Sequence, residues 1–330
     1  MTEVRNLLVL PRIRVQNANA ISSPMTWGFP AMSAFIGLMH ALERKLAARD
    51  VALVFDSVGV VCHDFEAQAT DTGYVRAFHL TRNPVDKSGD TAAIVEEGRI
   101  HLDITVFFAV RGDACSGAES ERLAVAEEIA GEVASMRIAG GSVIPPPPDS
   151  GRQARARPML LVLDEDDEAR QQQFRRLCYR CLPGFALVAR DDLLVRRLEE
   201  MRQATPDATE LDAWLDLSRR NYECRLEKIT DAQNDTREEV HWEIRRPPGW
   251  IVPIPVGYGA LTDIFEPGRV SNTRDATTPF RFVESVYSLG QWVSPHRLRH
   301  PADLLWYVDN TPDARLYRLN NDFSKRHANR

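Results

Sequence analysis

Two cysteines and two groups of acid–base residues are the side chains most able to do chemistry in this sequence. Cys178 and Cys181 form a single CxxC pair, and a four-cysteine zinc site would need a second pair that the sequence lacks. A redox CxxC begins a helix beside a strand, whereas this pair lies near the end of a predicted helix. We therefore expect no zinc or redox centre at these cysteines.

Acid–base chemistry could occur at two places in or beside predicted strands. His63 is followed by Asp64 and Glu66, and His101 is followed by Asp103. Residues two apart in a strand share a face, as His101 and Asp103 do, and the residues of both groups are close together in the sequence. Ordinary hydrogen-bonded side chains are the commoner outcome of this pattern. Walker A, GxSxG and HExxH patterns are absent from the sequence, and we expect no catalytic residue, metal or cofactor.

A glycine pair at Gly140 and Gly141 follows a predicted helix. A dinucleotide-binding fingerprint would place its glycines before a helix, so this order argues against one. Glycines after a helix still let the backbone approach a ligand closely, and a nucleic-acid backbone is one such ligand.

Residues 15–42 contain no Asp, Glu, Lys or Arg, which is unusual in a chain with 27% charged residues. Prolines and amides interrupt this stretch, so it cannot be a membrane span. Its Asn, Gln and Ser side chains could bind base edges or sugar hydroxyls, and Trp27 or Phe29 could stack on a base. The alternative is a polar loop whose amides cap strands and turns inside the protein.

The elements that must position these residues follow from hydrophobic periodicity. In the N-terminal half we predict a strand at 7–15, a loop at 16–30, a helix from Ser33 as N-cap to about Asp50, strands at 51–69 and 100–110, a helix at 119–136, and a glycine turn leading into a strand by 144. This is the β-α-β-β-α-β order of ferredoxin-like and RRM-like domains.

The second half divides into a mainly helical part and a β-rich part. We predict helices at 168–181, 192–204 and 209–226, a short strand at 182–188, and strands at 240–244 and 250–256 in an aromatic-rich C-terminal part. Four prolines at 145–148 suggest a boundary. The predicted domains are therefore 1–150, RRM-like; 151–240, a mainly helical insertion; and 241–330, a β-rich part packing on the first. The predicted fold class is α+β.

Composition and charge limit the function further. The 330 residues are 44% hydrophobic, which indicates a folded globular chain, and the five scattered cysteines are typical of a reducing, cytoplasmic protein. The start has no signal-peptide layout. The net charge of −6 argues against bulk electrostatic binding of nucleic acid, but the whole excess lies within Asp207–Glu243. The remainder is balanced and rich in arginine, which suits RNA recognition or reflects a GC-rich genome.

Several blocks of the sequence resemble one known family. The block LPRIRVQNANAISSPMTWGFPAMSAFIGLMHALER (10–44) closely resembles the start of the second Csy subunit of type I-F CRISPR surveillance complexes. The similarity continues in VGVVCHDFEAQ (58–68), HLTRNP (79–84), MRIAGGSVIP (136–145), LPGFALVAR (182–190), PGWIVPIPVGY (248–258), SPHR (294–297) and DLLWY (303–307). These blocks span nearly the whole chain, and the similarity is lost at 145–158 and 227–240.

The resemblance implies a fold and a function. It implies a modified RRM-like RAMP fold with a helical thumb, no catalysis, and a role in holding the 5′ handle of CRISPR RNA. It also implies pairing with the large Csy subunit as a heterodimer, a neighbouring backbone Csy subunit, target DNA reached only through the guide, and no membrane contact.

The matched blocks imply an RNA-binding surface. Its expected residues are Gln16, Asn17, Asn19, Ser22, Ser23, Trp27, Arg82, Asn83, Arg137, Gly140, Gly141, Ser142, His296 and Arg297, with Phe29 as a packing or stacking group. Arg137 would neutralise phosphate while the glycines admit the backbone. Two alternatives stay open: a metal-independent RAMP endoribonuclease using His63 or His101, and a protein–protein adaptor using the C-terminal aromatic residues.

Overall fold

The computed structural model describes residues 3–82, 85, 88–145, 157–230, 236–245, 247, 249–273, 275–311 and 313–327. Its helices are α1 (Met32–Ala47), α2 (Glu119–Ala134), α3 (Asp167–Arg180), α4 (Asp191–Ala204), α5 (Glu210–Ser218), α6 (Pro301–Leu304) and α7 (Phe323–His327). Its longer strands are β1 (Asn6–Asn19), β4 (Val54–Ala67), β9 (Arg99–Arg111), β13 (Phe185–Ala189), β14 (Asn221–Thr230), β15 (Thr236–Arg245), β16 (Trp250–Ala260), β17 (Val283–Val293), β18 (Trp306–Thr311) and β19 (Leu316–Asn321).

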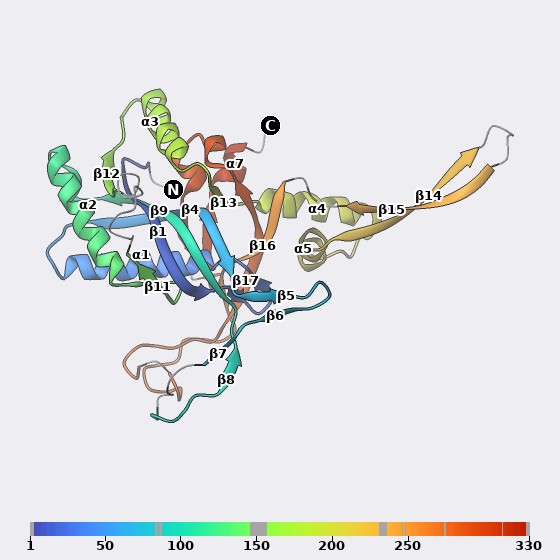
Figure 1. Ribbon diagram of the computed structural model, residues 1–330, viewed down its shortest axis with the longest axis horizontal. Coiled ribbons are helices and arrows are strands. Elements are labelled where there is room, and N and C mark those ends of the chain that lie inside the picture. Colours follow the sequence, from blue (N-terminus) through green and yellow to red (C-terminus); the bar gives the residue numbers. More distant parts are fainter. Residues whose placement is uncertain are drawn as a thin grey trace.

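Short strands complete the fold. They are β2 (Ile21–Ser23), β3 (Thr26–Trp27), β5 (Ala69–Asp71), β6 (Arg76–Phe78), β7 (Leu80–Arg82), β8 (Ile94–Glu96), β10 (Arg137–Ile138), β11 (Gly141–Ile144) and β12 (Met159–Val162). Helices and one large antiparallel sheet together make an α+β protein, as predicted (Figure 1). Among the described helices, none combines the length and the apolar character that crossing a membrane requires.

The N-terminal half contains its six principal elements in the predicted order, β1, α1, β4, β9, α2 and β11. Their strands lie side by side as β11-β1-β9-β4, and every neighbouring pair is antiparallel. Leu8 and Leu10 point to the face that α1 and α2 cover, whereas Leu7 and Val9 point to the opposite face, where α3 packs. Side chains alternate along a strand, so one run of apolar residues serves both faces.

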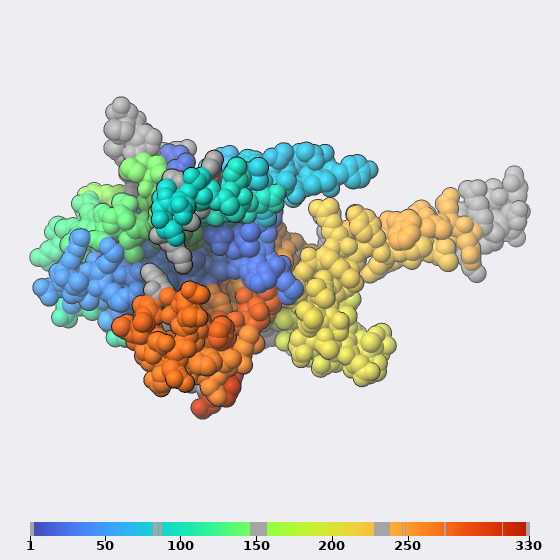
Figure 2. Space-filling model, turned by 90° about the horizontal axis from the view of Figure 1, so that it is seen from below, coloured from blue at the N-terminus to red at the C-terminus, as the bar shows by residue number. Residues whose placement is uncertain are grey.

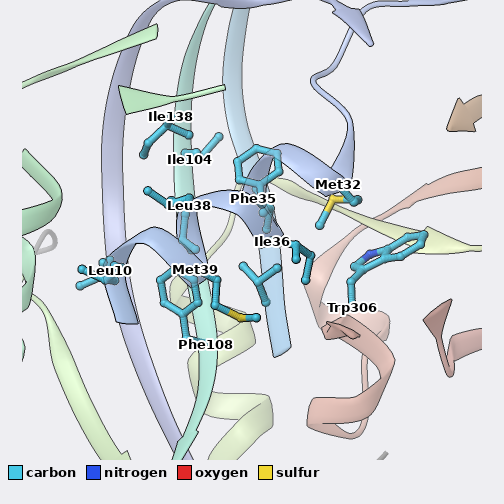
Figure 3. Close-up of a cluster of buried hydrophobic side chains, with 14 of the residues drawn as sticks. Leu10, Met32, Phe35, Ile36, Leu38, Met39, Ile104, Phe108, Ile138 and Trp306 are labelled. Carbon is cyan, nitrogen blue, oxygen red and sulfur yellow. The ribbon is translucent and has the colours of Figure 1, made fainter. Parts of the chain in front are cut away.

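Helix α1 supplies most of the core on its side of the sheet. Met32, Phe35, Ile36, Met39 and Leu42 are buried and face strand residues of the sheet. Figure 3 shows this cluster, with Ile104, Phe108 and Ile138 around the helix. The 3–4 spacing of these apolar residues places them on one face of a helix.

The predicted ends of α1 need correction. The helix begins at Met32 with Ala31 as N-cap, not with Ser33, and it ends at Ala47 rather than near Asp50. Met32 is buried, so packing extends the helix toward Pro30 although Ala31 offers no capping side chain. Asp50 adopts a left-handed backbone with φ 60°, which an α-helix cannot continue through.

The predicted loop at 16–30 is also wrong over much of its length. Strand β1 continues to Asn19, and β2 and β3 then form a small hairpin. β1 remains paired with β9 along this length through two shifts in register. Arg12 and Asn17 lie at these shifts, and each has a left-handed backbone conformation with φ 57°. Such bulges insert an extra residue without ending the strand. Ala18 and Ala20 are fully buried, which ties the segment to the body of the protein.

The C-terminal strands close a ring with β4. The order β4-β13-β17-β16-β19-β18 returns to β4, because Trp306 of β18 pairs with Val58. β12 also joins the sheet, by pairing with β1. One sheet thus takes strands from all three of the ranges 1–150, 151–240 and 241–330.

The predicted helix at 209–226 is too long. Helix α5 ends at Ser218, and strand β14 begins at Asn221 and pairs with β15 along its whole length. Tyr222, Cys224 and Leu226 alternate with charged residues, a period of two that belongs to a strand and not to a helix. The two strands extend from the body as an isolated ribbon (Figures 1 and 2).

Gly141→Ala is expected to lower the free energy of unfolding by about 2 kcal/mol. The added methyl group would overpack this site and force the neighbouring backbone of β1 to shift. A Cβ on Gly141 would lie 2.7 Å from both the Gln16 carbonyl oxygen and the Ala18 nitrogen. Gly140 has φ 79° and open space around its Cβ position, so Gly140→Ala is expected to cost only about 1 kcal/mol. Urea denaturation of both variants tests this, and equal losses would contradict it.

Candidate nucleic-acid interface

The hairpin that follows β1 uses several of the predicted RNA-binding side chains for its own structure. The Asn19 amide donates to the Ile21 carbonyl oxygen (2.8 Å) and accepts from the Ile21 N–H (3.1 Å). The Ser22 and Ser23 hydroxyls share Thr26 Oγ1, at 2.7 and 2.6 Å. Ser23 is buried. These side chains therefore shape the turn, and Ser23 is closed off from solvent.

Gln16 and Asn17 differ from the other polar residues of this segment. Both are exposed, and among the described residues neither side-chain amide has a hydrogen-bond partner. The Asn17 backbone is held instead, because its N–H donates to His101 Nδ1 at 3.1 Å. Two amides are thus presented on a fixed backbone, and each has a donor and an acceptor for an external ligand.

The two aromatic residues of the segment have different environments. Trp27 is exposed, with its ring centroid 5.8 Å from that of Phe78. Phe29 is half-buried, stacked on Phe35 at 5.6 Å and edge-on to Trp292 at 4.9 Å. Phe29 therefore packs against the body, whereas Trp27 offers an accessible ring.

The glycine turn lies beside this segment. Ser142 pairs with Gln16 on one side and with Arg137 on the other, so these three residues lie across neighbouring strands. Arg137, Gly140 and Ser142 are exposed, but Gly141 is buried. Gly141 lets the backbone of β1 approach closely, and a contact between the glycine pair and RNA stays a prediction.

A cavity of about 430 Å³ brings several candidates together, and we call it the α1 cavity. Asn19, Ser22, Arg137 and Gly140 line one part of it. The first turns of α1 line another part with small residues: Ser33, Ala34, Gly37 and Ala41. Tyr258 completes it, with its hydroxyl 3.3 Å from Ser33 Oγ. The cavity has one arginine and no carboxylate among its lining residues, so it suits an anionic or polar ligand.

The remaining predicted RNA-binding residues lie away from the α1 cavity or outside the described residues. Asn83 is outside the described residues, and Arg82 ends β7, whose hairpin with β8 projects from the sheet (Figure 1). His296 and Arg297 are exposed on a 3-10 turn that contacts α3, and they do not line the α1 cavity. The structure therefore does not unite them with the hairpin.

The acid–base candidates have structural hydrogen bonds. His63 Nδ1 donates to the Pro183 carbonyl oxygen at 2.8 Å, so Nε2 accepts from the Thr105 hydroxyl at 2.7 Å. Burial lowers the pKa of His63 and favours this neutral form. His101 Nδ1 accepts from the Asn17 N–H. Both ring nitrogens of His63 and one of His101 are therefore occupied.

The two cysteines of the CxxC pair offer little reactivity. Cys178 and Cys181 are buried free thiols, and burial raises the pKa of Cys181 to about 12. A thiol with such a pKa stays protonated and is a poor nucleophile and metal ligand. Within the described ranges, no three His, Cys, Asp or Glu side chains lie close enough to share a metal ion.

The ribbon of β14 and β15 is a candidate interaction surface that sequence reasoning missed. Register partners place its exposed apolar side chains on one face: Tyr222, Cys224, Leu226, Val240, Trp242 and Ile244. The other face carries charged groups, with Arg225 and Glu243 paired at 3.2 Å. The available signal was the alternation of apolar residues with charged residues or His241, over 222–227 and 239–245.

These features define an α+β protein that presents exposed amides, a small-residue cavity with an arginine, and a projecting two-faced ribbon. Comparison with known proteins identifies its class: the family described as CRISPR-associated protein (Cas_Csy2) matches residues 8–319. The chain is 45% identical over 331 residues to the CRISPR-associated protein Csy2 of Pseudomonas aeruginosa (strain UCBPP-PA14), covering 99% of both chains. The chain belongs to the Csy2 family, which confirms the resemblance to the second Csy subunit of type I-F complexes.

Proposed function

We propose that this type I-F Csy subunit is a non-catalytic RNA-binding subunit that holds the 5′ handle of CRISPR RNA and pairs with the large Csy subunit. The main support is the α1 cavity, where Arg137 and the exposed Gly140 lie beside the hairpin. Gln16 and Asn17, with their unpartnered amides, lie next to the same turn. An arginine for phosphate and amides for bases or sugars are the groups that single-stranded RNA requires.

The strand order supports an RRM-like RAMP fold for residues 1–150. In ferredoxin-like domains the four strands lie as 4-1-3-2, and β11-β1-β9-β4 is that order. Helix α3 covers part of the face opposite α1 and α2, so the exposed part of that face lies toward Arg14 and Gln16. The proposed domains 151–240 and 241–330 would then add to this unit rather than fold apart from it.

The absence of catalysis is part of the proposal. A RAMP endoribonuclease would need a histidine free to exchange protons with RNA. His63 uses both ring nitrogens within the protein, and His101 uses Nδ1, which leaves Nε2 of His101 as the nitrogen to test. An assay of purified protein with repeat RNA in EDTA tests this, because product formation would favour the endoribonuclease.

We assign the ribbon to a protein partner within the cytoplasmic complex, such as the neighbouring backbone Csy subunit. An exposed apolar face is typical of a protein interface. The segment 207–243 also carries the whole negative excess of the chain, which disfavours contact with phosphate. Target DNA would be reached only through the guide.

Arg137→Ala is expected to weaken binding of handle RNA about tenfold, since a charge-assisted contact is lost. The slope of log affinity against log salt should also fall by about one. Fluorescence anisotropy with labelled handle RNA and the full chain, purified with its Csy partner subunits, measures both quantities.

Arg111→Ala provides a matched control. Arg111 is exposed on the end of β9, and its side chain pairs with Asp56 at 3.2 Å. If both variants bind the handle as the unsubstituted protein does, the α1 cavity is not the phosphate site.

A further inference from the structure

A second cavity, of about 510 Å³, is walled by aromatic side chains and has no role in the proposal above. We call it the aromatic cavity. Trp27, Phe65, Phe185 and Trp250 line it and remain 44%, 55%, 43% and 46% exposed. Large apolar rings that stay exposed together on one concave surface usually mark a binding site, whereas apolar residues scattered singly over a surface do not.

The walls of the aromatic cavity are anchored to the core. Phe185 meets Trp250 edge-on with centroids 5.4 Å apart, and Trp250 lies 6.0 Å from Trp292. Trp292 in turn contacts Phe29, which stacks on the fully buried Phe35. This series of ring contacts holds Phe185 and Trp250 in place, so these two side chains would lose little conformational entropy when a ligand binds.

Two charged residues line the cavity, Asp64 and Arg76, and Arg76 is paired with Asp71 at 2.8 Å. Asp64 is therefore the group that can accept from a flat ring with hydrogen-bond donors. Asp64 lines the cavity, and one of its carboxylate oxygens accepts from the Phe65 N–H at 2.9 Å. The other oxygen has no partner among the described residues. A carboxylate accepts from the exocyclic amino group of a base, a group that uracil lacks.

The position of the aromatic cavity connects it with the α1 cavity. Ser22, Pro30 and Ala31 line both, so the two lie on either side of the hairpin and the chain leading into α1. A nucleotide strand crossing there could place phosphate near Arg137 and a base among the rings. A protein side chain would use the rings but has no need of Arg137 in the neighbouring α1 cavity.

We propose that the aromatic cavity receives one unstacked nucleobase of the bound RNA, a base that carries an exocyclic amino group. The inference rests on the proposed RNA-binding function and adds the subsite that distinguishes one nucleotide from its neighbours. Stacking on the rings supplies affinity, and Asp64 supplies the preference for an amino-bearing base.

The test scans the handle with abasic nucleotides, using the full chain purified with its Csy partner subunits. One abasic position should weaken binding at least about fivefold, as expected for loss of one stacked base. In the double variant Phe185→Ala/Trp250→Ala, an abasic nucleotide at that position should weaken binding no more than one at any other position. Tyr179→Ala is the matched control, because Tyr179 is an exposed ring on α3, away from the ribbon, and does not line the cavity.

The possible results distinguish the base site in the aromatic cavity from the proposed RNA-binding function. Normal handle affinity in the double variant, with an unchanged abasic profile, overturns the base site and leaves RNA binding intact. Loss of a Csy partner with RNA binding unchanged identifies a protein side chain as the occupant and also overturns it. Failure of the unsubstituted assembly to bind the handle overturns both proposals.

A second measurement needs no substituted protein. 2-Aminopurine at the sensitive position should lose fluorescence on binding, because it stacks on the cavity rings. Replacement of the natural base there by an analogue without its amino group should weaken binding several-fold. Unquenched fluorescence at every handle position would contradict the base site even if the double variant fails to fold.

Discussion

Trp306→Ala is expected to lower the free energy of unfolding by about 3–5 kcal/mol, the largest effect of any substitution considered. Trp306 is fully buried and belongs to the core on the α1 side of the sheet (Figure 3). Its indole N–H donates to the Leu187 carbonyl oxygen at 2.9 Å, and that oxygen would lose this partner. The residue also forms the pairing between β18 and β4.

Urea denaturation followed by far-ultraviolet circular dichroism measures the loss. Trp306→Phe is the control, because it keeps most of the ring volume and removes the hydrogen bond, and it should cost about half as much or less. A loss below about 1 kcal/mol in the alanine variant would show that the ring of strands does not depend on this side chain.

Asp216→Ala is expected to destabilise the protein by about 3 kcal/mol and to loosen the base of the ribbon. The buried Asp216 carboxylate accepts from Arg245 of β15 at 2.8 Å and from Arg197 of α4 at 2.7 Å. Alanine would leave both arginines without this partner. We place the effect at the low end of the range for broken buried pairs because both arginines are partly exposed.

The matched control is Glu243→Ala, which removes an exposed ion pair with Arg225 on the same ribbon. Exposed pairs contribute about 0–1 kcal/mol, so this variant should unfold almost as the unsubstituted protein does. Limited trypsin digestion should cleave near Arg245 faster in Asp216→Ala only. Equal cleavage in both variants would show that Asp216 does not hold the ribbon.

The same carboxylate predicts a pH dependence. Burial alone would raise the pKa of Asp216, but hydrogen bonds from Arg245 and Arg197 outweigh it and hold the pKa below its usual value. The contribution of the Asp216 carboxylate to the free energy of unfolding is therefore complete above the unfolded-state pKa, near 4. It is lost as the pH falls through the lower folded-state pKa. The stability difference between the unsubstituted protein and Asp216→Ala should shrink over that acid range.

Local patterns in the sequence were enough to predict the helices and strands whose apolar residues follow a single helical or strand pattern. Helix α1 follows from the spacing of Phe35, Leu38, Met39 and Leu42, and β4 follows from the continuous apolar run at 58–62. Their ends were less predictable, because the burial of Met32 and the left-handed backbone at Asp50 are set by tertiary packing. The same holds for Asn17, where a bulge keeps a polar segment within a strand.

The candidate site was predictable in its residue types and less so in their roles. Gln16, Asn17 and Arg137 are exposed, as an RNA contact requires, whereas Ser23 and Gly141 are buried. Nothing local in the sequence distinguishes Gly140 from Gly141, because the difference lies in the approach of β1. The aromatic cavity was hidden for the same reason, since Trp27, Phe185 and Trp250 come from distant segments.

The pairing of Trp306 with Val58 has a consequence for how the protein is made. Strand β4 emerges early from the ribosome, but its last neighbour in the ring belongs to the C-terminal part of the chain. Until β18 is synthesised, one edge of β4 stays partly unpaired, and contacts between such distant residues form slowly. The N-terminal half therefore completes its strand pairing only with the C-terminal part, and a prematurely terminated chain would keep part of this β4 edge exposed.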